Sequence, residues 1–316
     1  MLRGVMLHIR VVTPSDLRVA LLAALDRSPA VHNVVTLLDV ARRPDGDLVQ
    51  FDVAREAANE VIQSLRDLDL HRRGSIAIER VDASLSDVAA YAEARAPGDP
   101  SEAVVWEEVE ARVRGESSLS WSYLVTMSVA VMIGAVAVLT DSPVLIVGAM
   151  VVGPDYGPVA GLTLNVHRRR LDRTRSALLA LGVGYVVAIL WALLLTLGVR
   201  LIGNLPVAYE SGIRPLTSFV AQPDGWSVIV AILAGVAGTI ALTQAKAGAI
   251  VGVLISVTTI PAASNVAVAI GTGRWNEAQG AAAQLLLNLV LMVVVGVGVL
   301  RIEQRLSRVS VRRTPS

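Results

Sequence analysis

The sequence lacks the residue patterns of most enzymes and metal-binding proteins. Its 316 residues include no cysteine, which is compatible with a cytosolic location for a soluble part. Its four histidines do not stand at the His-x-x-x-His or His/carboxylate spacings that would hold a metal. A Gly-x-Ser-x-Gly nucleophile motif and a nucleotide-binding glycine loop are also missing. We therefore expect a protein that is not an enzyme and that holds no metal and no cofactor.

A secretory signal and a large net charge are missing as well. Residues 1–9 are too short for a signal segment and are followed at once by Arg10 and Asp16. We therefore expect the first membrane segment to act as the insertion signal. The formal net charge is only +1, and we expect no nucleic-acid partner.

Apolar side chains are abundant and unevenly distributed. They make up 53% of the residues, and the mean hydropathy of +0.59 is too high for a soluble chain of this length. Charges are frequent up to about residue 118, whereas the later apolar runs approach or exceed the roughly 20 residues that cross a bilayer. We predict a soluble domain (1–83), a helical linker (84–120), a membrane domain (121–301) and a basic tail (302–316).

The soluble domain alternates strand-like and helix-like patterns. The segments "VMLHIRVVTP", "VVTLLDVAR", "LVQFDVA" and "GSIAIERV" have the composition of strands, and "RPDGD" is typical of a hairpin turn. The segments "SDLRVALLAALDRS" and "REAANEVIQSLRDL" have helical periodicity. The resulting order βαββαβ indicates a ferredoxin-like α+β domain. Such domains often bind small effectors or pair with copies of themselves, and the sequence leaves both roles open.

The hydropathy pattern predicts an α-helical membrane domain with six transmembrane helices. A basic loop follows the second segment, and the C-terminal tail is also basic, so both are expected in the cytoplasm by the positive-inside rule. We therefore expect a multi-pass protein of the inner (cytoplasmic) membrane with both termini in the cytoplasm. The six segments span residues 121–140, 142–166, 174–202, 226–243, 247–270 and 278–301.

The basic loop is dense in arginine. Its arginines are Arg168, Arg169, Arg170, Arg173 and Arg175. Membrane topology and contact of Arg168, Arg169 and Arg170 with the anionic headgroups of membrane lipids explain this density. A substrate or phosphate site is the alternative.

The second segment contains a stretch that does not fit an unbroken helix. Within "GAMVVGPDYGPVAGLTLNV" (148–166) stand two Gly-Pro steps and Asp155. Proline removes helical hydrogen bonds and glycine permits a turn. Broken backbone survives in hydrocarbon only where protein or a water-filled cavity surrounds it. We predict a break at which Asp155 takes a cation or a proton, or alternatively a water-exposed re-entrant tip with no substrate.

A shift of 104 positions (251 − 147) aligns the first three segments with the last three without a gap. It sets "VGVLISVTTIPAASNVAVAI" against the first break, with Pro261 opposite Gly157. Each half has three crossings, so the second half must be inverted relative to the first. An inverted 3+3 repeat with broken second and fifth helices is typical of the substrate site of secondary transporters.

The two breaks together define the candidate substrate- or ion-binding site. Neutral polar side chains around the second break are suited to bind a substrate, or alternatively hold neighbouring helices together. The candidate residues are Gly153, Pro154, Asp155, Gly157 and Pro158 in the first break, and Thr258, Thr259, Pro261, Ser264 and Asn265 in the second.

Both motifs resemble those of the bacterial and archaeal membrane proteins grouped as domain of unknown function 389. The family's Gly-Ala-Met run and Pro-x-x-x-Pro break are matched by Gly148, Ala149, Met150, Pro154 and Pro158, and its second proline segment by Pro261, Asn265 and Val266. The resemblance covers roughly residues 120–300 and implies a similar membrane architecture with no assigned activity. Asp155 stands where the family pattern is usually apolar, and Ala262 replaces a frequent second proline.

We predict an integral membrane transporter or channel for a small solute or ion, regulated by its cytoplasmic domain and assembled as a homo-oligomer. The alternative is a membrane-anchored sensor or scaffold whose soluble domain binds a small-molecule effector or a partner. A transporter predicts a wet cavity that reaches Asp155 and Asn265. A scaffold predicts that both side chains are packed and dry.

Overall fold

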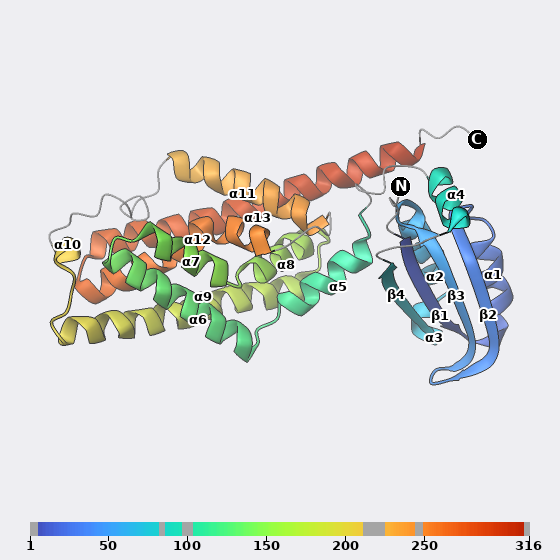
Figure 1. The fold of residues 1–316 in the computed structure, drawn as a ribbon, viewed down its shortest axis with the longest axis horizontal. Coiled ribbons are helices and arrows are strands. Elements are labelled where there is room, and N and C mark those ends of the chain that lie inside the picture. Colours follow the sequence, from blue (N-terminus) through green and yellow to red (C-terminus); the bar gives the residue numbers. More distant parts are fainter. Residues whose placement is uncertain (1–5, 82–85, 97–103, 211–224, 244–248, 313–316) are drawn as a thin grey trace. The chain divides into compact units, whose positions relative to one another are not determined.

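A computed structural model describes residues 6–81, 86–96, 104–210, 225–243 and 249–312 (Figure 1). The chain divides into two compact units. Unit 1 comprises Met1–Val109 and Arg305–Ser316, and unit 2 comprises Glu110–Gln304. Each unit has its own hydrophobic core, so the two are described separately.

Unit 1 contains a small antiparallel sheet in the strand order β2-β3-β1-β4. Apolar residues alternate along β1, where Leu7, Ile9 and Val11 are fully buried in one core with residues of α1 and α2. The predicted order βαββαβ is therefore confirmed. Its elements are β1 (Met6–Thr13), α1 (Arg18–Leu25), β2 (Val31–Arg42), β3 (Asp45–Ala54), α2 (Ala58–Asp67) and β4 (Ser75–Val81), with a short α3 (Leu70–Arg73) before β4.

Two helices, α4 (Asp87–Arg95) and α5 (Trp106–Glu116), follow the sheet and lie within the range 84–120 that the sequence analysis assigned to a helical linker. The first turn of α5 is held by unit 1. Arg55 pairs with Glu108 at 3.1 Å, and Arg66 pairs with Glu107 at 3.3 Å. The helix is therefore attached to the sheet domain through its acidic side chains.

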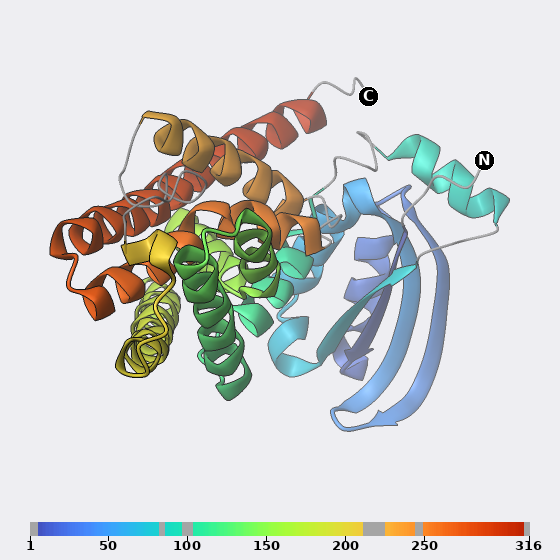
Figure 2. The same ribbon diagram turned by 60° about the vertical axis from the view of Figure 1, so that its left-hand side comes forward.

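Unit 2 is a bundle of apolar helices (Figures 1 and 2). Among the described residues, four helices are long and apolar enough to cross a membrane, or five if the bent pair α7 and α8 counts as one span. The chain is thus a multi-pass membrane protein. The helices are α6 (Trp121–Leu139), α7 (Pro143–Val152), α8 (Tyr156–His167), α9 (Leu171–Leu201), α10 (Val207–Glu210), α11 (Gly225–Thr243), α12 (Ala249–Thr272) and α13 (Trp275–Arg312), which extends beyond unit 2.

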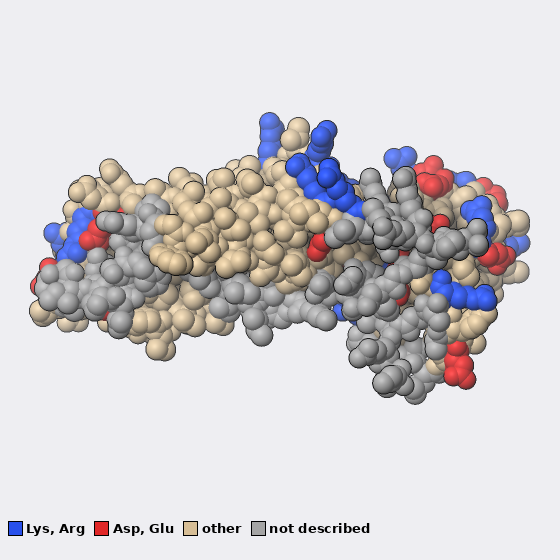
Figure 3. All heavy atoms as spheres, turned by 90° about the horizontal axis from the view of Figure 1, so that it is seen from above, with Lys and Arg blue, Asp and Glu red and all other residues tan. Residues whose placement is uncertain are grey.

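The outer surface of unit 2 is suited to lipid. Leu179, Leu194 and Leu233 are each about 60% exposed, which is unfavourable in water and favourable against acyl chains. Figure 3 shows uncharged residues over the middle of unit 2 and charged ones toward its ends. Trp121 and Trp275 begin helices and are largely exposed, as expected of side chains at a membrane interface.

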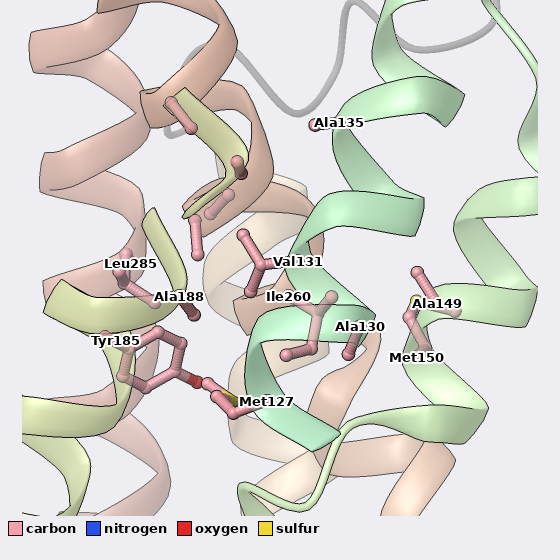
Figure 4. Packing of buried hydrophobic residues seen from close by; sticks show 14 of the residues in the cluster. Met127, Ala130, Val131, Ala135, Ala149, Met150, Tyr185, Ala188, Ile260 and Leu285 are labelled. Carbon is pink, nitrogen blue, oxygen red and sulfur yellow. The ribbon is translucent and has the colours of Figure 1, made fainter. Parts of the chain in front are cut away.

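Small residues allow the inner helices to pack closely. A Cβ added to Gly134 of α6 would lie 2.2 Å from the Ser264 hydroxyl of α12. Figure 4 shows buried side chains around α6, where the ring of Tyr185 on α9 points toward Met127. Close approach through glycine is how membrane helices gain van der Waals contact.

The predicted break of the fifth segment is wrong. Helix α12 runs without interruption from Ala249 to Thr272 with Pro261 inside it. A proline removes only one backbone hydrogen bond and clashes with one carbonyl, and buried surroundings can hold such a helix together. Pro261 and its next neighbours, Ala262 and Ala263, are buried, so tertiary packing opposes the break.

Candidate functional site

The break in the second segment is confirmed. Helix α7 ends at Val152, α8 starts at Tyr156, and their axes are bent by 57°. Residues that precede a proline avoid the α conformation, and Gly153 before Pro154 is extended with φ −65° and ψ 127°. Asp155 lies about 18 Å along α8 from the basic loop, roughly half the thickness of a hydrocarbon core.

The structure corrects the roles predicted for three residues of this break, Gly153, Gly157 and Pro158. Gly153 adopts a conformation open to any residue, so the turn does not depend on glycine there. Gly157 lies inside α8, where a Cβ would come within 2.4 Å of the Glu116 carbonyl oxygen, so its role is close packing. Pro158 is in the first turn of α8, whose N–H groups have no partner in any helix, and it removes no hydrogen bond. Pro154 alone breaks the segment.

Asp155 is completely buried at the start of α8 and meets side chains from two other helices. The hydroxyl of Tyr185 on α9 donates to its Oδ2 atom at 2.9 Å. The hydroxyl of Thr259 on α12 donates a short hydrogen bond to the same oxygen. A buried carboxylate is thus met by two neutral donors.

The other predicted polar residues of the second segment serve different purposes. Ser264 donates to the carbonyl of Ile260 on its own helix at 2.8 Å and contacts the carbonyl of Val131 on α6 at 3.0 Å, so it joins helices. Asn265 is 1% exposed, and its amide has no hydrogen-bond partner among the described residues. The side chain of Thr258 lies outside the described residues.

The sequence interpretation missed the tyrosines of this site. Tyr185 donates a hydrogen bond to Asp155. The hydroxyl of Tyr123 on α6 is close enough to interact electrostatically with Asp155. The signal was present, because the chain has only five tyrosines and these two stand inside apolar helices. A buried tyrosine hydroxyl usually has a polar partner nearby.

The site is dry in this conformation. Asp155 and Asn265 are 0% and 1% exposed, and they line neither the cavity beside Tyr156 and Thr163 nor the one beside Glu110. By the criterion set out from the sequence, these packed side chains are the outcome predicted for a scaffold, and the wet cavity predicted for a transporter is not observed at Asp155 and Asn265. Such packing is also expected of an occluded carrier, because occlusion closes the site from both sides.

The basic loop is organised around one carboxylate of unit 2. Glu110 of α5 forms ion pairs with Arg168, with Arg170 at 3.0 Å and with Arg173 at 3.6 Å. Arg169 is exposed and has a positive φ of 56°. The arginines expected to meet lipid headgroups are therefore not equivalent.

Comparison with known proteins supports the resemblance of the two motifs. Residues 150–294 match the profile of the family described as a domain of unknown function, DUF389. No curated protein and no solved structure matches the chain. The matched residues include Pro154, Asp155 and all of α12, so the candidate site lies inside the family domain. The family predicted from the motifs is therefore the one whose profile residues 150–294 match.

Proposed function

We propose that the protein is an integral membrane carrier for a small solute or ion, with Asp155 as the group that binds the transported or coupled ion. The observation that carries this proposal is the complete burial of this carboxylate at the helix break. A charged side chain near the centre of a bilayer costs at least about 2.5 kcal/mol. A purely structural bundle gains nothing from it.

An inverted repeat of two three-helix halves, the arrangement predicted from the sequence, supports this reading. Asp155 and Thr259 are 104 residues apart and hydrogen bond to each other, and 104 is the shift that aligns the halves. In a pseudo-two-fold structure, equivalent positions meet only at the axis. A site on that axis is equally reachable from both sides as the halves rock.

The turns that follow α8 and α12 support the same register. The N–H of Arg170 bonds to the carbonyl of Asn165 at 2.9 Å, and 104 residues later the N–H of Arg274 bonds to the carbonyl of Ala269 at 2.8 Å. Arg169 and its equivalent Gly273 both have positive φ, 56° and 82°. This is the hydrogen-bond pattern of helices that end in a left-handed residue, and it occurs at matching places.

Two further contacts, one between α9 and α12 and one between α13 and α8, also form an equivalent pair. Arg200 donates to the carbonyl of Gly271 at 2.9 Å, which ties α9 to the end of α12. In the alignment of the halves, Gln304 is equivalent to Arg200 and His167 is equivalent to Gly271. The side chains of Gln304 and His167 share a hydrogen bond that ties α13 to the end of α8. We infer that the two contacts close the site toward the two sides of the membrane, which accounts for its dryness.

The remaining parts of the chain fit a regulatory role. Unit 1 has the strand order β2-β3-β1-β4, and we propose that it is a ferredoxin-like domain that faces the cytoplasm, binds a small effector and assembles the protein as a homo-oligomer. Helix α5 begins in unit 1 and ends in unit 2, and its glutamates pair with arginines of both. The sensor or scaffold stays the second candidate, because the site is dry.

Electrometry on the purified full-length protein in liposomes tests the carrier. Jumps of pH, of sodium and of a panel of charged metabolites should produce a current in the wild type that Asp155→Asn abolishes. Asp141→Asn is the matched control, because Asp141 follows the end of α6 and lies outside the break. A current that survives in Asp155→Asn would remove the aspartate from the pathway. Silence of the wild type, with a ligand that protects only unit 1 from hydrogen exchange, would favour the sensor.

A further inference from the structure

Glu110 lies at the centre of an excess of positive charge. Besides Arg168, Arg170 and Arg173, it contacts Arg114 of its own helix at 3.9 Å. Four guanidinium groups therefore share one carboxylate, which leaves a local net charge of +3 within this cluster. The Glu110 side chain is only 12% exposed, so solvent screens these charges incompletely.

A cavity of about 170 Å³ opens beside this cluster. Since one water occupies about 30 Å³ of liquid, the cavity has room for several waters or for one tetrahedral oxyanion. Its polar lining consists of Glu110, Arg114, Ser117, Ser118, Asn165, Arg173 and Ser176. Guanidinium groups and hydroxyls are the donors that phosphate oxygens prefer.

We propose that this cavity binds a single phosphate group, carried either by a lipid headgroup or by a soluble phosphate, and that Glu110 is an internal anion which the phosphate displaces. A dianionic soluble phosphate neutralises more of the cluster than one carboxylate does, a lipid phosphodiester with its single negative charge neutralises as much, and either reaches Arg114 and Arg173 from the cavity side. Glu110 is then freed from the loop. The two anions compete for the same guanidinium groups.

The selective use of the loop arginines argues for a built site over a simple topology signal. An arginine that only sets the orientation of the protein in the membrane needs no particular partner. Any arginine of the loop can supply that positive charge. Here Arg168, Arg170 and Arg173 converge on one carboxylate, whereas Arg169 is exposed and does not form an ion pair with Glu110. Among the arginines of the loop that pair with Glu110, Arg173 is the one that also lines the cavity.

The test measures anion binding to the full-length protein in nanodiscs, with no transport readout. In phosphatidylcholine nanodiscs, inorganic phosphate should raise the thermal unfolding temperature of the protein. Sodium chloride at the same ionic strength should not raise it. Arg173→Gln should weaken phosphate binding by about tenfold. Arg169→Gln is the matched control and should bind as the wild type does. Glu110→Gln should bind about fivefold more tightly, since the internal competitor is gone.

The gain in Glu110→Gln keeps the test independent of misfolding, because a damaged protein does not bind more tightly. Native mass spectrometry after exchange into phosphatidylglycerol nanodiscs distinguishes the two sources. Retained phosphatidylglycerol that blocks inorganic phosphate identifies a headgroup site, and unhindered phosphate binding identifies a soluble ligand. Equal phosphate binding in wild type and Arg173→Gln, or unchanged binding in Glu110→Gln, would overturn the proposal.

Discussion

The hydroxyl of Tyr185 donates a hydrogen bond of 2.9 Å to Oδ2 of Asp155 and so joins α9 to the break between α7 and α8. Tyr185→Phe removes this donor from a completely buried carboxylate and should lower the free energy of unfolding by about 1–3 kcal/mol. Thermal unfolding in detergent measures the loss. Tyr123→Phe is the control, since the Tyr123 hydroxyl has no hydrogen-bond partner in the part of the chain that the structure describes. Equal losses in both variants would contradict a specific role for Tyr185.

Thr259 reaches the same oxygen from α12, and its hydroxyl can be tested apart from its volume. Thr259→Val keeps the shape and removes the donor, so we expect a loss of about 1–2 kcal/mol, whereas Thr259→Ser should retain most of the stability. If the carrier proposal is correct, the ion dependence of the current should also shift in the valine variant and be restored by serine. A valine variant with wild-type stability and current would show that this bond is incidental.

Close packing of α6 against α12 depends on Gly134. Because a Cβ there would lie 2.2 Å from the Ser264 hydroxyl, Gly134→Ala should cost about 1–3 kcal/mol despite the better helix propensity of alanine. The double variant Gly134→Ala/Ser264→Ala should recover part of the loss. Gly148→Ala is the matched control, since an added Cβ would have no atom of another described element within 4 Å, and its stability should be unchanged or slightly higher. Chemical denaturation in mixed micelles gives these differences.

His32 should make unit 1 sensitive to acid. Burial lowers the pKa of His32 below its ordinary 6.5, although the nearby Asp52 opposes this, and its ring nitrogens have no hydrogen-bond partner among the described residues. The unfolded chain therefore takes up a proton near pH 6.5 while the folded chain does not. The stability of unit 1 is unaffected above that pH and falls as the pH drops toward the folded pKa.

Hydrogen exchange of the β2 and β3 amides, corrected for the intrinsic pH dependence, tests this expectation in the full-length protein. Protection should fall between pH 7.5 and pH 5.5 in the wild type, and the change should be smaller in His32→Leu. An identical pH dependence in both proteins would assign the acid sensitivity to another group.

Local chemistry accounts for the parts of the fold that the sequence predicted. The order of strands and helices in unit 1 follows from short apolar patterns and from the turn at "RPDGD". The break before Asp155 follows from Pro154, which acts on its immediate neighbour. The expected break at Pro261 failed for the converse reason, because buried neighbours keep α12 helical through a residue that disfavours a helix.

The sequence predicted the candidate site only in part, because local chemistry locates the helix break and does not locate the contacts between helices. Amino-acid composition alone determined that this is a multi-pass membrane protein, and proline chemistry determined where its second segment breaks. Only tertiary structure decided that Asp155 meets Tyr185 and Thr259, which are 30 and 104 residues away, and that Glu110 collects the arginines of a distant loop. Such contacts depend on how helices cross in the folded bundle, and no local pattern encodes the distance between two side chains that far apart in the chain.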